Sequence, residues 1–102
     1  MAEEFNPDWT LAPAATLAEW MREHGLTRGM LARRCGSGEA DVKASLIIRD
    51  VLNREPLLES HAEMLERGTG ITAAFWLNYE RNYRADLAAG RTDTTPEDGG
   101  DA

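Results

Sequence analysis

Side chains with catalytic potential are few in this chain, and their spacing does not form a catalytic or metal site. The two histidines, His24 and His61, lie on different predicted helices, and neither belongs to an HExxH or HxxxH arrangement that binds zinc. The sequence Gly36-Ser37-Gly38 lacks the lysine and the preceding strand of a phosphate-binding loop. We therefore expect no catalytic residue, no metal and no cofactor, and predict that the protein is not an enzyme.

Basic side chains form the one candidate functional cluster in the sequence. Together they could bind the phosphates and base edges of a nucleic acid. Between Arg22 and Arg54 seven basic residues outnumber four acidic ones, a net charge of +3, which leaves −10 for the rest of a chain whose total is −7. Duplex DNA rewards such clustering, and the acidic flanks would suit a second, cationic partner. On charge alone, ordinary solvated helix faces explain the same residues equally well.

Length and composition indicate one small domain of 102 residues. No apolar run approaches the roughly 20 residues that span a bilayer, and the opening MAEEFNPDW lacks the layout of a signal peptide. The lone Cys35 cannot form an internal disulfide and fits a reducing compartment. We expect a cytoplasmic protein that does not contact membranes, with Cys35 buried as a small hydrophobe.

Local signals divide the chain into five helices, and no β-like alternation persists anywhere. Glycines, prolines and threonine caps mark the helix ends. The predicted helices run from Pro13 to His24 before Gly25, from Thr27 to Cys35 before Gly36, over about 39–53 ahead of Pro56, from Glu59 to Arg67 before Gly68 and Gly70, and from Thr72 towards Gly90. The predicted fold class is therefore all-α, with one domain over residues 13–90.

The two ends of the chain are predicted to lie outside this helical domain. Residues 1–12 form an N-terminal arm that Phe5 and Trp9 can anchor through their apolar side chains. The tail RTDTTPEDGGDA, residues 91–102, has no apolar residue except its last alanine. Such a segment cannot offset its ordering entropy, so we expect it to be disordered.

The segment Thr27–Asn53 has the spacing of a helix-turn-helix motif. That motif needs a small residue midway along its first helix, a glycine four residues later, and a branched apolar residue six after that to lock the helix crossing. Ala32, Gly36 and Val42 meet these requirements. A plain helical hairpin has the same features, so the pattern alone leaves both interpretations open.

Aromatic residues on the last predicted helix exceed what one small core can absorb. Phe75, Tyr79 and Tyr83 recur every four residues, and Trp76 lies on a different face. Aromatics at helical spacing are more often core or subunit interface than a base-stacking platform. We therefore expect Phe75, Trp76, Tyr79 and Tyr83 to supply core and a dimer or partner interface.

Three stretches of the chain carry a resemblance to a known family. PDWTLAPAATLAEWMREHGLT is similar to the family's opening, MLARRCG to its Glu-Leu-Ala-x-x-x-Gly helix, and HAEMLERGTGITAAFWLNYERNYRADLA to its Phe-Trp-Leu-Asn ending. Over roughly residues 6–88 the chain resembles the HigA-type antitoxins of the XRE-like helix-turn-helix group and related phage and actinobacterial regulators.

The resemblance implies a lambda-repressor-like domain of five helices with an extended C-terminal helix. It implies a homodimer that binds double-stranded operator DNA and regulates its own transcription. It also implies a small basic ribonuclease toxin as partner, which the antitoxin neutralises. The acidic flanks of this chain are compatible with such a cationic partner.

The chain departs from the family between the turn glycine and the end of the reading helix, where it has about six residues more. In one register Val42 locks the crossing, and the side chains of Glu39, Ala40, Lys43, Ala44 and Ile47 face the DNA groove. In the other, residues 37–44 are an inserted loop, Ile48 locks the crossing, and Lys43, Arg49, Asp50 and Arg54 face the groove. The carboxylates of Glu39 and Asp41 lie where phosphates should approach. Either could accept a hydrogen bond from a cytosine amino group, but repulsion from the phosphates is the favoured expectation.

Two functions follow as hypotheses. The first is a dimeric, sequence-specific DNA-binding regulator in which arginines grip phosphates and Lys43 and Arg49 face the bases. The second is a protein-interaction module whose altered helix-turn-helix no longer reads DNA and which sequesters a toxin or a host protein. The predicted DNA-binding residues are Thr27, Arg28, Arg33, Arg34, Lys43, Ala44, Ile47, Arg49 and Arg54.

Overall fold

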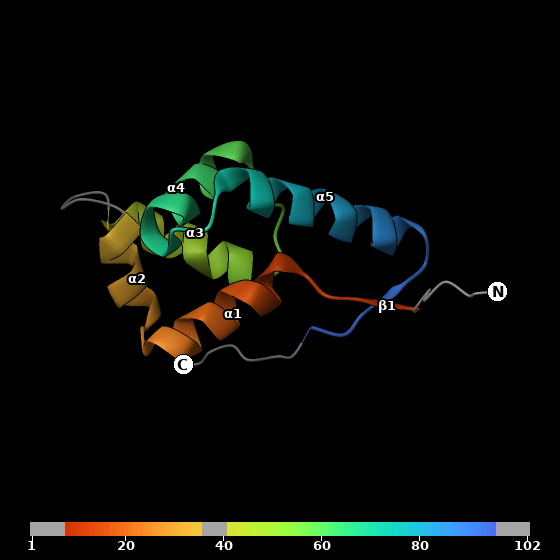
Figure 1. The fold of residues 1–102 in the computed structure, drawn as a ribbon, viewed down its shortest axis with the longest axis horizontal. Coiled ribbons are helices and arrows are strands. Elements are labelled where there is room, and N and C mark those ends of the chain that lie inside the picture. The colour runs from red at the N-terminus through yellow and green to blue at the C-terminus, as the bar shows by residue number, and fades with distance from the viewer. Residues whose placement is uncertain (1–7, 36–40, 96–102) are drawn as a thin grey trace.

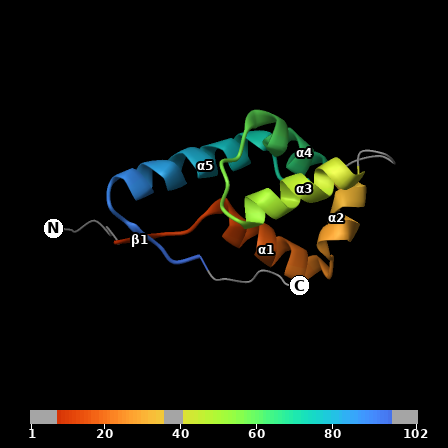
Figure 2. The same ribbon diagram turned by 180° about the vertical axis from the view of Figure 1, so that it is seen from behind.

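The computed structural model describes residues 8–35 and 41–95 of the chain. Within these residues lie five helices and two short strands (Figure 1): β1 (Trp9–Thr10), α1 (Pro13–His24), α2 (Arg28–Cys35), α3 (Asp41–Leu52), α4 (Glu59–Thr69), α5 (Ala73–Ala88) and β2 (Thr92–Asp93). The mostly helical domain of five helices expected from the sequence is confirmed. Helices α2, α3 and α4 gather at one end of the molecule, while α5 extends towards the strands at the other end (Figures 1 and 2).

Four helix ends are set by single residues that the sequence identifies. Gly25 closes α1 and Gly70 closes α4, with positive φ angles of 64° and 83° that glycine adopts without strain. The Thr72 hydroxyl caps α5 by accepting a hydrogen bond from the N–H three residues later, at 3.2 Å. Thr27 caps α2 in the same way, also at 3.2 Å.

One hydrophobic core joins all five helices. Each helix contributes at least one side chain with 0% exposure, among them Leu17, Leu31, Ile48, Leu65 and Trp76. The prediction that Trp76 belongs to a partner interface is therefore wrong, because the core encloses its whole side chain. The prediction that Cys35 is buried is confirmed, and burial raises the pKa of its thiol.

Gly68 lies inside α4 and marks its closest approach to α2, although the sequence analysis placed it at the helix end. A Cβ at this position would lie 2.2 Å from Cys35 Sγ and 3.2 Å from Leu31 Cδ1. Two arginines bridge the same contact in opposite directions. Arg34 Nε donates to the Gly68 carbonyl at 2.9 Å, and Arg67 Nε donates to the Cys35 carbonyl at 3.1 Å. Only glycine permits this approach between the two helices.

We predict that Gly68→Ala lowers the free energy of unfolding by about 1–3 kcal/mol, because the added methyl overpacks a closed contact. Urea unfolding followed by circular dichroism measures the change. Gly29→Ala is the matched control in α2, where the nearest atom to an added Cβ is 4.0 Å away, and it should cost nothing. Adding Cys35→Ala should offset part of the Gly68→Ala loss in a double-mutant cycle. Equal stability of Gly68→Ala and the wild type would contradict the close approach.

The segment after α5 folds back onto the body of the domain. β2 pairs in parallel with β1, and Thr92 lies opposite Trp9. Thr95 is buried, and its hydroxyl accepts a hydrogen bond from the Ala12 N–H at 2.7 Å. The prediction of a disordered tail is therefore wrong for residues 91–95, and the all-α description lacks this small sheet. The rest of the tail, like Phe5 in the arm, lies outside the described residues.

Asp93 is the centre of the polar network that holds this segment. Its carboxylate accepts hydrogen bonds from the Tyr83 hydroxyl at 2.5 Å, from Arg54 Nε at 3.0 Å and from the Thr95 N–H at 2.8 Å. Arg84 donates in turn to the Arg54 carbonyl at 2.8 Å. Burial alone would raise the pKa of Asp93, but the hydrogen bonds from Thr95 and Tyr83 and the Arg54 charge hold it below its usual value. Burial and the adjacent Asp93 raise the pKa of Tyr83 to about 12.

We predict that Asp93→Asn lowers the free energy of unfolding by about 1–3 kcal/mol at pH 7, since hydrogen bonds to a charged group are lost. The folded pKa of Asp93 is depressed, so its contribution is present above the unfolded pKa of about 3.9 and disappears as the pH falls through the folded pKa. The difference between variant and wild type should therefore shrink below about pH 4. Urea unfolding at pH 7 and pH 3 tests this. Asp50→Asn, at an exposed ion pair, is the control and should stay within about 0.5 kcal/mol at both pH values.

Candidate nucleic-acid interface

Helix α3 packs into the core through a single apolar face. Ala44, Ile48 and Val51, separated by four and three residues, are at most 3% exposed. Val42 is 71% exposed, so the register in which Val42 locks the helix crossing is wrong. Ile48 occupies the core, as the other register predicts. The same register predicts an inserted loop over residues 37–44. For residues 41–44 this prediction is wrong, because they form the first turn of α3.

Two apolar residues of α3 predicted to face DNA belong to the core side of the helix. Ala44 is 2% exposed and cannot reach a ligand. Ile47 is half-buried and packs at the edge of the core. Both were misassigned because the core register of α3 differs by a fraction of a turn from the one that Val42 would set. Gly36, Glu39 and Ala40 lie outside the described residues, so the predicted turn is not placed.

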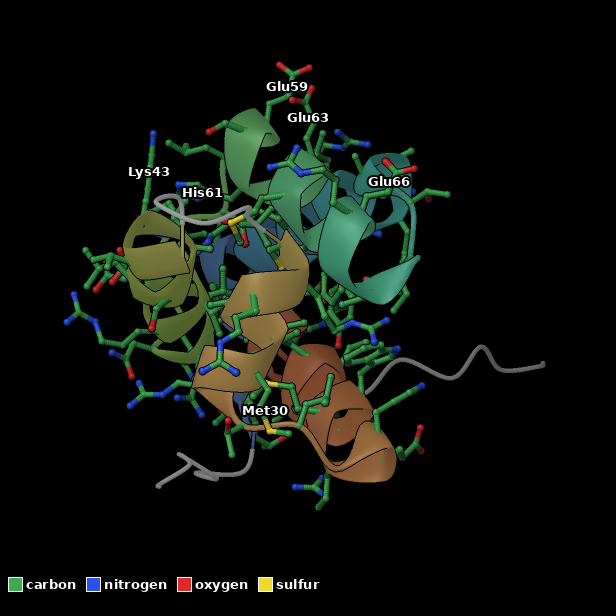
Figure 3. The ribbon with its side chains drawn as sticks, turned by 90° about the vertical axis from the view of Figure 1, so that its left-hand side faces the viewer. Met30, Lys43, Glu59, His61, Glu63 and Glu66 are labelled. Carbon is green, nitrogen blue, oxygen red and sulfur yellow. The ribbon has the colours of Figure 1, made fainter. Side chains whose placement is uncertain are left out.

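The outward face of α3 carries a line of exposed side chains opposite its buried face. Val42, Leu46 and Arg49 follow one another at spacings of four and three residues, and Asn53 continues the line just beyond the helix. Lys43 flanks this line and projects away from the body of the molecule (Figure 3). The surface therefore combines two aliphatic side chains with a guanidinium, an amide and an ammonium.

The three arginines of α2 are all exposed, and Arg34 in addition serves the fold. Arg28 and Arg33 are exposed. Arg34 donates to the Gly68 carbonyl, and its guanidinium carbon lies 5.6 Å from the ring centre of Trp20, so packing fixes its stem. Thr27 is exposed and acts as the α2 cap. Of these predicted site residues, Arg28 and Arg33 remain available to bind phosphate.

Arg54 is not part of the α3 surface, although the sequence analysis assigned it to DNA. It is half-buried and has a φ of 67°, which turns the chain after α3. Its guanidinium binds Asp93 at 3.0 Å and the Thr95 carbonyl at 2.8 Å. Its charge is therefore used to hold the C-terminal segment. Arg49, by contrast, is exposed, and within the described residues its ion pair is a 3.5 Å contact with the half-exposed Asp50.

The aromatic stripe of α5 is divided between the interior and the surface. Tyr83 is 3% exposed and, like Trp76, cannot form the partner interface that was predicted for it. Phe75 is 38% exposed and stacks on Tyr79, which is half-buried, with ring centres 5.7 Å apart. Only Phe75 and Tyr79 of the four predicted residues can still contact a partner.

Helix α4 is acidic, with three glutamates against one arginine, whereas α3 is neutral, with two acidic and two basic residues. Glu59, Glu63 and Glu66 project outward from α4 at spacings of four and three residues (Figure 3). Glu66 also accepts a hydrogen bond from the Ala73 N–H at 3.1 Å, which joins α4 to the start of α5. A polyanion would therefore be repelled by α4 and attracted by the basic side chains of α2 and α3.

The described residues contain no group of three His, Cys, Asp or Glu side chains that could hold a metal ion. No helix within them is long and apolar enough to cross a membrane.

Leu46 and Asn53 are surface residues to which the sequence analysis gave no role. The helical period could have identified them. If Ala44, Ile48 and Val51 form the core face of the helix, Leu46 and Asn53 must lie on the opposite face.

No protein-family model, curated protein or solved structure matches this chain. Its function is therefore inferred from the geometry of α3, the distribution of charge and the resemblance to HigA-type antitoxins.

We predict that Ile48→Ala lowers the free energy of unfolding by about 2–5 kcal/mol, because it leaves a cavity in the core. Val42→Ala, on the same helix, should change it by no more than about 0.5 kcal/mol, because Val42 is exposed. Chemical denaturation of both variants gives the comparison. A large loss for Val42→Ala with a small one for Ile48→Ala would reverse the register of α3.

Proposed function

We propose that this protein is a sequence-specific DNA-binding transcriptional regulator in which α2 and α3 act as a helix-turn-helix and α3 enters the major groove. The observation that carries the proposal is the outward face of α3. It lies opposite the core and presents Val42, Leu46 and Arg49. Aliphatic groups contact thymine methyls, and arginine pairs with guanine, so these side-chain types suit base edges.

The charge distribution supports the same function. Arg28 and Arg33 on α2 and Lys43 on α3 are exposed and can contact the phosphates on either side of a groove. The carboxylates of α4 then restrict how the domain approaches the duplex. With a total charge of −7, the chain as a whole gains little from non-specific attraction to DNA.

The proposed regulator acts as a homodimer on two half-sites, with Phe75 and Tyr79 as the exposed part of its subunit interface. Their stacked rings offer apolar area outside the core. The resemblance to HigA-type antitoxins supports this arrangement and adds autoregulation of the protein's own promoter. A cytoplasmic location belongs to the same proposal.

The test is binding to the intergenic duplex upstream of the protein's own gene, measured by mobility shift and fluorescence anisotropy over a range of salt. Arg49→Ala should weaken binding by about 1–3 kcal/mol and relax the base preference at one position. Arg33→Ala should weaken binding to all sequences and reduce the salt slope by about one. Arg81→Ala, an exposed arginine on α5, is the matched control and should leave binding unchanged. Absence of any shift at low salt would refute the proposal.

A second candidate function is the sequestration of a cationic protein, such as a small basic toxin or a host protein. The carboxylates of Glu59, Glu63 and Glu66 on one face of α4 favour it. Co-purification of the adjacent gene's product, combined with failure to shift any duplex, would support this function in place of the first. A regulator of the antitoxin type would show both activities.

A further inference from the structure

We propose that Val42 and Leu46 form a pair of thymine readers, so that the DNA bound by this protein carries two thymine methyl groups at matched positions in the major groove. This inference rests on the proposed DNA-binding function. Val42 is 71% exposed and Leu46 46% exposed, and they lie one turn apart on the face of α3 opposite the core. Neither side chain contributes to the hydrophobic core of the domain.

The exposed aliphatic pair can contact a ligand, and the charged side chains beside it favour one class of ligand. Lys43 is adjacent to Val42 in the chain and projects outward, and Arg49 is the next residue in the line after Leu46. Two carboxylates belong to α3 as well: Asp41 directly precedes Val42 in the chain, and Asp50 contacts Arg49 at 3.5 Å. An apolar strip with Lys43 and Arg49 beside it suits a polyanion with apolar groups inside it. The major groove is such a surface, because phosphates line its edges and thymine methyls project from its floor.

The spacing along α3 sets the spacing of the methyl groups. Residues four apart on a helix are separated by about 6 Å along its axis. Base pairs follow one another at about 3.4 Å, so the two side chains would contact thymines about two steps apart. Valine and leucine have neither hydrogen-bond donors nor acceptors in their side chains, so they distinguish thymine from cytosine by the C5-methyl group alone.

The decisive probe is deoxyuridine, which pairs as thymidine does but lacks the C5-methyl group. A duplex is first selected from a random-sequence pool with the wild-type protein, and its thymidines are then replaced, singly and together. Loss of one contacted methyl should weaken binding about fourfold, and loss of both about 10–20-fold. Replacement of other thymidines should have no effect.

The variant Val42→Ala/Leu46→Ala provides the control for effects of deoxyuridine on the DNA itself. It should bind the thymidine duplex more weakly than the wild type and bind both duplexes equally. Arg49→Ala should bind both more weakly and keep the wild-type ratio between them. Circular dichroism should show unchanged folding, because all three side chains are exposed.

Each remaining outcome contradicts a different statement. If the wild type binds both duplexes equally, the thymine-reading inference fails while the DNA-binding function stands. If the double variant keeps the wild-type ratio, the methyl effect arises in the DNA, and the inference fails again. If the pool yields no duplex, both the proposed function and the thymine-reading inference fail. A protein partner would then be the ligand of this face of α3.

Discussion

The contact between α2 and α4 at Gly68 fixes the position of the helix on which α3 rests. Helix α2 has only eight residues, too few to be stable without tertiary packing. It is held because Gly68 lets Cys35 approach the α4 backbone, and because Arg34 and Arg67 each donate to a carbonyl of the facing helix. The two arginines satisfy backbone acceptors at the contact, and their stems cover its edges. The placement of α3 against α2 depends on this contact.

The turn that follows α3 is held by a second set of contacts, which are polar. Arg54 has a φ of 67°, which costs a non-glycine residue about 1–2 kcal/mol. Its guanidinium binds Asp93 and the Thr95 carbonyl, and its own carbonyl accepts from Arg84, so one residue joins the end of α3 to α5 and β2. The C-terminal segment therefore stabilises the domain without apolar residues.

Local features of this chain could be predicted from its sequence, whereas features set by distant partners could not. Gly25 and Thr72 act within one turn of their own helices, and the ends that they set are predicted correctly. Gly70 also acts locally, but α4 continues to Thr69, two residues beyond its predicted end. Gly68 was read as a terminator because its function depends on Cys35, which is remote in sequence. The tail is predicted to be disordered because it lacks apolar residues, whereas in its described part, residues 91–95, Arg54 and Tyr83 bind Asp93. In the candidate site, the exposure of Arg33, Lys43 and Arg49 agrees with the prediction. Ala44 is buried because the register of α3 differs from the one that Val42 would set, and Arg54 is occupied because it binds Asp93 and the Thr95 carbonyl.

The core register of α3 also determines what its surface can recognise. Burial of Ala44, Ile48 and Val51 directs Val42, Leu46 and Arg49 outward, so the fold and the outward face are set by the same helical period. The carboxylates of α4 and the total charge of −7 weaken attraction to DNA in general. On the proposed function, base contacts by α3 must then supply a larger share of the binding free energy than they do in a basic protein. A regulator of this kind would bind weakly to most DNA and would depend strongly on a few side chains at its own site.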